Sequence, residues 1–140
     1  MRLVLTALAL ALATVALPAQ TPATFVVTVA GVPSDQGHIL VALYRNSEDF
    51  PKTGHADYTR KVPARRGTTA VEFALLDPGD YALAVIHDAD DDGTVTTNAL
   101  GMPKEAYGFG NGARGTFGPP DFAAAVVHFD GRNGSRVTIK

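Results

Sequence analysis

The sequence predicts an all-β protein: a single antiparallel β-sandwich of about seven strands, with one long, glycine-rich, ordered loop. Three observations predict this fold class. Most of the chain alternates between apolar and polar residues, turn-forming Gly, Pro, Asn and Asp residues separate the alternating runs, and no amphipathic helical pattern occurs outside the N-terminal segment. Short strands joined by turns, without helices between them, are typical of two packed antiparallel sheets.

The N-terminal segment, residues 1–19, has the pattern of a secretory signal peptide. Arg2 supplies a positive charge, residues 3–17 form an apolar run rich in Leu and Ala, and small residues suited to cleavage follow. This run is too short to span a bilayer comfortably, although an uncut membrane anchor is the alternative. We therefore expect residues 20–140 to form one β-sandwich domain that is periplasmic or secreted, with no membrane insertion after the signal is removed.

Five runs that precede the long loop are predicted to be strands: residues 25–29, 38–44, 58–62, 70–75 and 81–87. The second run is almost continuously apolar, which indicates a central strand covered on both faces. The third run carries Arg60 and Lys61, and charged side chains protect the edge of a sheet. Pro78 and Gly79 favour a tight turn before the fifth run, because Pro fixes φ and Gly accepts a positive φ.

Two more strands are expected after the loop. Residues 124–129 and 136–139 are apolar or alternating, and the turn-forming residues 130–134 lie between them. This order predicts a hairpin that closes the domain.

Composition limits the partners that the domain can have. The 140 residues include 12 Lys and Arg against 14 Asp and Glu, a net charge of −2, and loss of Arg2 with the signal makes the balance more acidic. This argues against nucleic acid or an anionic membrane surface as a partner. The chain has no cysteine, so its stability must come from the apolar core and from any ion that it binds.

The segment from 88 to 122 breaks the strand pattern. It contains seven glycines, and structureless loops of this length are usually functional or disordered. Its large apolar side chains argue for an ordered loop that folds back on the domain, with disorder as the alternative. Those side chains are Leu100, Met102, Tyr107, Phe109, Phe117 and Phe122.

The acidic start of this loop has the spacing of a calcium-binding loop. Asp88, Asp90 and Asp92 alternate and are followed by Gly93, a pattern that places carboxylates around one centre before a sharp turn. Thr94 would supply a backbone carbonyl and Thr96 a hydroxyl or a bridging water. The bidentate Glu of an EF-hand is absent, because Ala99 occupies the twelfth position. Asn98 or Glu105, folding back, would complete the ligands.

Two other classes of function remain open. The loop can serve as a recognition surface for an unknown protein or small molecule without any ion. Alternatively, His87, Asp88 and Glu105 can act as catalytic groups if they converge in a cleft. A simpler role for His87 is a hydrogen bond to a carboxylate or carbonyl group that fixes the direction in which the chain enters the loop.

The pattern of the loop resembles a bacterial exported family named domain of unknown function 2141. The residues that carry the resemblance are His87-Asp88, Asp92-Gly93, Thr97-Asn98, Gly101, Pro103-Lys104-Glu105, Tyr107-Gly108-Phe109, Phe117-Gly118-Pro119-Pro120 and, upstream, Leu76, Pro78, Gly79 and Tyr81. The family has no assigned activity, so the resemblance implies export and a transthyretin-like or immunoglobulin-like sandwich. The family typically has Asn at positions 90 and 92 and Asp at position 96, where this chain has Asp90, Asp92 and Thr96.

The sequence therefore predicts an exported, non-enzymatic β-sandwich module whose acidic loop binds Ca²⁺. The expected metal ligands are Asp88, Asp90, Asp92, Thr94, Thr96, Asn98 and Glu105, and no catalytic residue is assigned. A second set of residues is expected to shape the loop: His87, Gly93, Gly101, Pro103, Tyr107, Phe109 and Phe117.

Overall fold

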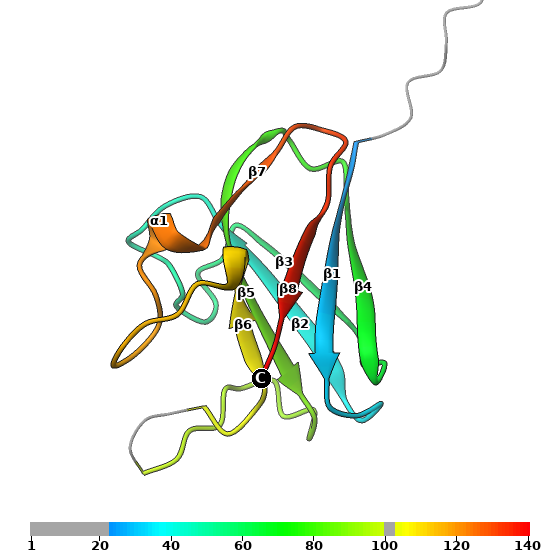
Figure 1. Ribbon diagram of the computed structural model, residues 1–140, viewed down its shortest axis with the longest axis vertical. Coiled ribbons are helices and arrows are strands. Elements are labelled where there is room, and N and C mark those ends of the chain that lie inside the picture. Colours follow the sequence, from blue (N-terminus) through cyan, green and yellow to red (C-terminus); the bar gives the residue numbers. More distant parts are fainter. Residues whose placement is uncertain (1–22, 100–102) are drawn as a thin grey trace, which may run out of the picture.

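The computed structural model describes residues 23–99 and 103–140, which form two packed β-sheets (Figure 1). The strands are β1 (Thr24–Val32), β2 (His38–Tyr44), β3 (Tyr58–Pro63), β4 (Gly67–Ala74), β5 (Gly79–Asp88), β6 (Tyr107–Phe109), β7 (Val126–Phe129) and β8 (Ser135–Thr138). A short 3-10 helix, η1 (Gly110–Gly112), follows β6, and one helical turn, α1 (Phe122–Ala125), precedes β7. The prediction of an all-β sandwich is confirmed.

The predicted signal peptide, Leu100, Gly101 and Met102 lie outside the described residues. Within residues 23–99 and 103–140, no helix is long and apolar enough to cross a membrane.

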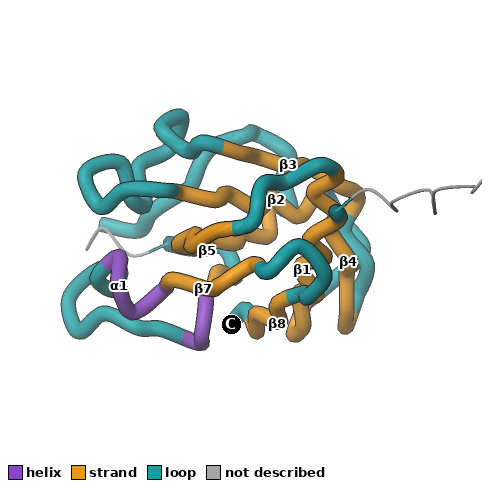
Figure 2. The backbone as a smooth tube through the Cα atoms, turned by 90° about the horizontal axis from the view of Figure 1, so that it is seen from above, coloured by secondary structure: helices purple, strands orange, loops and turns teal. Residues whose placement is uncertain are grey.

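The two sheets form the two layers seen in Figure 2. One sheet has the strand order β4-β1-β8, and the other has the order β3-β2-β5-β6. In the larger sheet, β5 is paired along both edges: β2 follows one edge, while β7 and then β6 pair with successive parts of the other. The central position predicted for residues 38–44 is confirmed, since β2 lies between β3 and β5.

The core lies between the sheets and follows from the period-two pattern of the strands. In β2 and β5, alternate side chains such as Val41 and Leu83 point inward and are fully buried. They meet inward-facing residues of β1 and β4, including Phe25 and Phe73. The rings of Phe25 and Phe129 pack with their centroids 5.0 Å apart, so β7 also contributes to this core.

The predicted closing hairpin is wrong. β7 pairs antiparallel with β5, whereas β8 pairs parallel with β1 in the other sheet. The segment between them therefore crosses from one sheet to the other at one end of the sandwich (Figure 1). The Asp130 carboxylate accepts hydrogen bonds from the backbone N–H groups of Arg132 and Asn133, which stabilises a wide connection in place of a two-strand turn.

A second, smaller apolar cluster lies on the outer face of the larger sheet. Phe50 is at its centre, 7% exposed, with ring centroids 5.4 Å from Tyr44, 5.8 Å from Phe109 and 5.9 Å from Phe122. The long loop is therefore ordered in part by Phe109 of β6 and Phe122 of α1, which pack against Phe50 on the outer face of the sheet. Phe117 does not pin the loop as expected, because its side chain is fully exposed.

The turn before β5 is held by a buried tyrosine. Tyr81 is fully buried, and its hydroxyl donates a 2.7 Å hydrogen bond to the backbone carbonyl of Asp77. We expect Tyr81→Phe to lower the free energy of unfolding by about 1–2 kcal/mol, since the carbonyl loses its partner. Urea denaturation measures this change. Tyr58→Phe, at a partly exposed edge position, is the control and should cost about 0.5 kcal/mol or less. Equal losses in the two variants would contradict this role for Tyr81.

Candidate metal centre

The pairing of β5 with β6 brings together the two ends of the segment from 88 to 105. β5 and β6 are antiparallel neighbours, with Ile86 opposite Tyr107, and the His87 N–H continues the ladder to the carbonyl of Ala106. One step further along this ladder, Asp88 lies opposite Glu105. Residues two positions apart on a strand point to the same face of the sheet. Asp88 therefore points the same way as Ile86, and Glu105 the same way as Tyr107, so both carboxylates lie on the outer side of the sheet.

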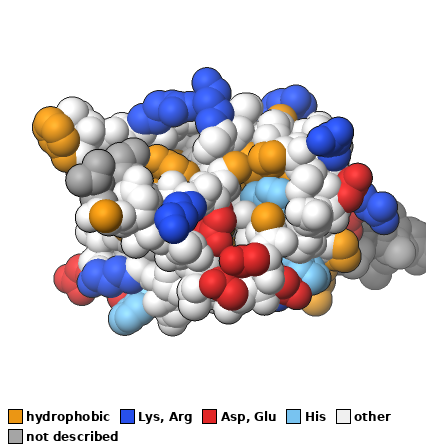
Figure 3. All heavy atoms as spheres, turned by 90° about the horizontal axis from the view of Figure 1, so that it is seen from below, with side chains coloured by type: hydrophobic (Ala, Val, Ile, Leu, Met, Phe, Trp, Pro, Cys, Tyr) orange, Lys and Arg blue, Asp and Glu red, His pale blue; other side chains and the backbone are white. Residues whose placement is uncertain are grey.

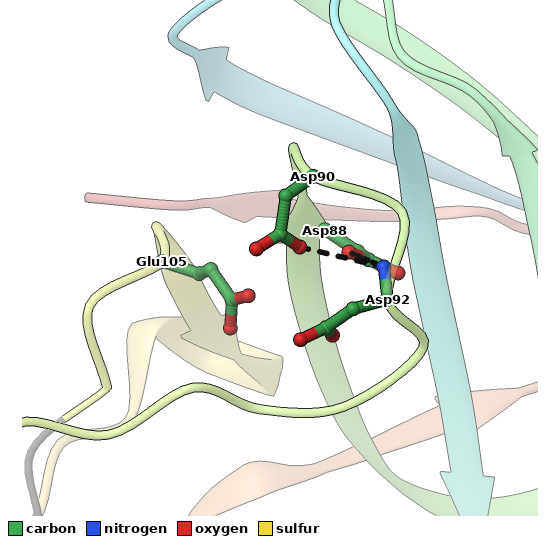
Figure 4. A group of neighbouring side chains, drawn as sticks. All are labelled: Asp88, Asp90, Asp92 and Glu105. Atoms are coloured by element: carbon green, nitrogen blue, oxygen red, sulfur yellow. Dashed lines mark hydrogen bonds between the residues drawn. The ribbon is translucent and has the colours of Figure 1, made fainter.

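Four carboxylates meet at this point. Asp88, Asp90, Asp92 and Glu105 each present an oxygen, and these oxygens all lie within 4.8 Å of one another (Figure 4). Asp88 is 1% exposed, Glu105 is partly buried, and the other two are exposed. Such a group could hold a metal ion. Without a cation, like charges at about 4 Å repel by roughly 1 kcal/mol per pair in water and by more where water is excluded.

The loop folds around the first carboxylate. The Asp88 side chain accepts hydrogen bonds from the backbone N–H groups of Asp92, at 3.2 Å, and Gly93, at 3.0 Å. The Asp92 carboxylate in turn accepts the backbone N–H and the hydroxyl of Thr94, at 2.8 and 2.9 Å. These hydrogen bonds favour the ionised form and lower the pKa of Asp92. Gly93 makes the turn with a φ of 74°, as the pattern predicted.

Glu105 is the carboxylate whose charge is least balanced by hydrogen bonds. Its Oε2 accepts the backbone N–H of Thr96 at 3.1 Å, whereas its buried Oε1 has no hydrogen-bond partner among the described residues. Burial raises the pKa of Glu105, the charges of Asp90, Asp88 and Asp92 raise it further, and the Thr96 hydrogen bond opposes them. The fold therefore holds an under-compensated oxygen against three other acids.

Asp91 is excluded from the group although it lies between two members. Its φ of 60° turns the side chain away, and its carboxylate forms an ion pair with Lys61 and lies 2.9 Å from Nδ1 of His38. The hydrogen bond from Lys61 is the main cause of the lowered pKa of Asp91. The run of acids thus divides into alternate residues that converge and one that anchors the loop to β3.

The other expected ligands lie in the same loop but differ in the contacts that they make. The hydroxyl of Thr94 is used by Asp92, and Thr96 contributes its backbone N–H to Glu105. The chain after Thr96 is closed by a bridge between Thr97 and Pro103 and by a 2.8 Å hydrogen bond from the Lys104 N–H to the Thr96 carbonyl. Asn98 lies within this closed segment, and Gly101 lies outside the described residues.

His87 faces away from the carboxylates. Neighbouring residues of a strand point to opposite faces, so His87 points toward the inner side of the sheet while Asp88 points outward. The His87 side chain is 3% exposed, and its Nε2 lies 2.7 Å from the backbone carbonyl of Gln36. The structure therefore does not bring His87, Asp88 and Glu105 together in one cleft.

Gly37 is a positioning residue that the sequence analysis missed. It has a φ of +63°, and a Cβ atom there would lie 1.9 Å from the backbone oxygen of Asp88 and 2.8 Å from Cα of Ala89. The turn before β2 therefore packs directly against the start of the acidic loop. The turn-forming sequence from Pro33 to Gly37 signals a glycine with positive φ, but not this contact with another strand.

This contact makes Gly37→Ala a test of how the loop is held. We expect the variant to lose about 2 kcal/mol or more of unfolding free energy, because it adds a backbone clash to the strain of positive φ. Gly54→Ala is the matched control: φ is +79°, nothing lies within 4 Å of the added Cβ, and the strain alone should cost about 1 kcal/mol. Similar losses for both variants, measured by urea denaturation, would show that the turn does not support the loop.

Comparison with known proteins identifies the family. No curated protein and no solved structure matches the chain. A family model described as an uncharacterised protein conserved in bacteria, domain of unknown function 2141, matches residues 27–137. The match runs from within β1 to within β8 and includes the whole acidic loop. The chain therefore belongs to the domain of unknown function 2141 family of bacterial proteins.

Proposed function

We propose that this protein is an exported, non-enzymatic β-sandwich module whose loop between β5 and β6 binds Ca²⁺. The observation that carries the proposal is the arrangement of Glu105: a buried oxygen without a partner faces three other carboxylates. A cation in their midst would turn the mutual repulsion into attraction. It would also give Oε1 of Glu105 the partner that the described protein atoms do not supply.

The chemistry of the group favours calcium over other metals. All four side chains offer oxygen, and neither His nor Cys is among them. Oxygen ligands suit hard cations, whereas zinc and copper prefer imidazole or thiolate groups. Calcium accepts six to eight oxygens in flexible geometry, while magnesium requires a near-ideal octahedron and retains water. Asp88, Asp90, Asp92 and Glu105 would be the side-chain ligands, and Thr94 and Asn98 lie in the loop that surrounds them.

The site fits a structural ion more closely than a catalytic one. Asp88 is anchored by two backbone N–H groups and Asp92 by Thr94, so the loop is already folded around the carboxylates. With His87 on the other face of the sheet, the proposal assigns no reaction to these residues. The predicted signal peptide supports an extracytoplasmic location. Extracellular calcium-binding modules typically bind calcium with dissociation constants of about 10⁻⁴–10⁻³ M.

Calcium is expected to stabilise the fold by mass action. At a few millimolar calcium the gain in unfolding free energy should be about 1–2 kcal/mol relative to chelator, with little effect of magnesium. Urea denaturation of the full chain measures this gain. Asp90→Asn should reduce the gain, whereas Asp91→Asn should keep it, because Asp91 pairs with Lys61 and His38 instead. A stability that does not change between calcium and chelator would sink the proposal.

The effect of Glu105→Gln on the free energy of unfolding should change sign between chelator and calcium. In chelator the variant should be at least as stable as the parent at neutral pH, because it removes a buried charge that faces three acids. In millimolar calcium it should be the less stable protein, because it lacks one ionic ligand. The two unfolding free energies are compared under both conditions. A variant that is destabilised equally in chelator and in calcium would show that Glu105 has a packing role only.

A further inference from the structure

A cavity that the metal centre does not use lies on the outer face of the larger sheet. Its volume is about 600 Å³, within the range of small-molecule sites. Leu40 and Ala42 of β2 lie opposite Ile86 and Ala84 of β5, and these four outward-facing residues form the floor. The two alanines make the floor low, because methyl groups stand where larger side chains would fill the space. The alternation that builds the core thus also builds an apolar floor.

Loops form walls around this floor. Residues from the segments 51–56 and 115–119 border the cavity, and the acidic loop contributes Val95 and Pro103. In Figure 3, hydrophobic side chains are exposed between basic and acidic groups. The described loops therefore surround this part of the sheet without filling the space above it.

In the described part of the chain, the lining directs no unpaired charge into the cavity. Only Arg60 and Lys61 are charged among the described residues that line it. Arg60 pairs with an inward-facing residue of β2, and its guanidinium lies over the ring of Phe73, 5.4 Å from the centroid. The guanidinium is therefore on the core side of the sheet. Lys61 points to the outer face, but its ammonium pairs with Asp91.

The electrostatics of this face favour a neutral ligand. An ionised group that leaves water for apolar surroundings loses hydration, and no described side chain of the lining is free to compensate an anion. The four carboxylates of the metal centre are close, since Glu105 lies between Pro103 and Tyr107, which both line the cavity. Without a cation, their charge disfavours an anion further. A cationic ligand meets no acidic residue in the described lining.

Aromatic side chains favour a ligand that contains rings. Tyr107 and Phe109 of β6 lie opposite Ile86 and Ala84, so they face outward, and their ring centroids are 5.9 Å apart. Phe117 lines the cavity from its rim, where its side chain is fully exposed, as is uncommon for a large aromatic residue. Aromatic rings attract one another in edge-to-face and offset-stacked arrangements, beyond the effect of the apolar area that they bury. A ring system therefore gains contacts here that a simple hydrocarbon chain does not.

We propose that this cavity binds a neutral, apolar small molecule that contains aromatic rings. The rings would lie over Ala42 and Ala84 and would contact Tyr107 along one side. Phe117 would cover them from the rim. This inference goes beyond the proposed calcium site and does not depend on it.

Fluorescence titration of the full chain in chelator tests the proposal apart from calcium. The probe is N-phenylnaphthylamine, a neutral molecule of linked aromatic rings. The comparison is anilinonaphthalenesulfonate, which adds one sulfonate to the same skeleton. We expect the neutral probe to bind about tenfold more tightly, because no described lining group compensates the sulfonate. Absence of binding by the neutral probe, or equal or tighter binding of the sulfonate, would overturn the proposal.

Removal of the partner of Lys61 should change this selectivity. Asp91→Asn leaves an unpaired ammonium on the outer face, so affinity for the sulfonate should rise about threefold while affinity for the neutral probe stays the same. Asp80→Asn is the matched control, because it changes the net charge equally at an exposed residue outside the cavity. Equal rises in sulfonate affinity in the two variants would contradict a binding site beside Lys61.

Two further variants locate the neutral probe. Ala42→Leu fills part of the floor and should weaken binding about tenfold, and Phe117→Ala should weaken it about three- to tenfold. Leu75→Ala removes an exposed hydrophobic residue that does not line the cavity and should leave the affinity unchanged. Phe117→Ala carries the test if Ala42→Leu fails to fold, because a fully exposed side chain adds little to stability. The same affinity in Phe117→Ala and Leu75→Ala would show that the probe binds elsewhere.

Discussion

Strand β5 is paired along both of its edges, and this pairing positions both the core and the acidic loop. Its inward face contributes Tyr81, Leu83 and Val85 to the core, and its outward face contributes Ala84 and Ile86 to the floor of the cavity. Its end positions the candidate metal centre, because pairing with β6 and the hydrogen bond from His87 to Ala106 bring Asp88 close to Glu105. One strand therefore connects packing, cavity and carboxylate group, and a shift of its register by one residue would exchange the two faces.

The acidic loop combines strong local order with unbalanced charge. The Asp88 carboxylate accepts hydrogen bonds from two backbone N–H groups, and the hydrogen bonds that Thr94 donates to Asp92 lower the pKa of Asp92. Glu105 lies just before β6, at a point where burial and the neighbouring acids raise its pKa. Folding brings these groups together because the apolar core and the strand ladders contribute more than the repulsion costs. The preorganised loop then needs little rearrangement to receive a cation.

The sequence predicts the parts of the fold that depend on local patterns. Alternation in residues such as Val71 and Phe73 predicts strands, and the Pro78-Gly79 turn marks the start of β5. The parallel pairing of β8 with β1 could not be predicted, because nothing local distinguishes a crossing connection from a hairpin. β6 was missed because three residues, one of them Gly108, are too few to show alternation.

The sequence predicts only the part of the candidate site that the spacing of its acidic residues encodes. Alternate acids followed by Gly93 indicate which carboxylates converge, and Glu105 was expected to fold back. The role of Gly37 depends on a contact between distant strands, which no local pattern encodes. A high-resolution crystal structure grown in calcium would show whether these carboxylates hold an ion. We expect an ion about 2.3–2.6 Å from oxygens of Asp88, Asp90, Asp92 and Glu105. The same four carboxylates around water alone, at millimolar calcium, would contradict it.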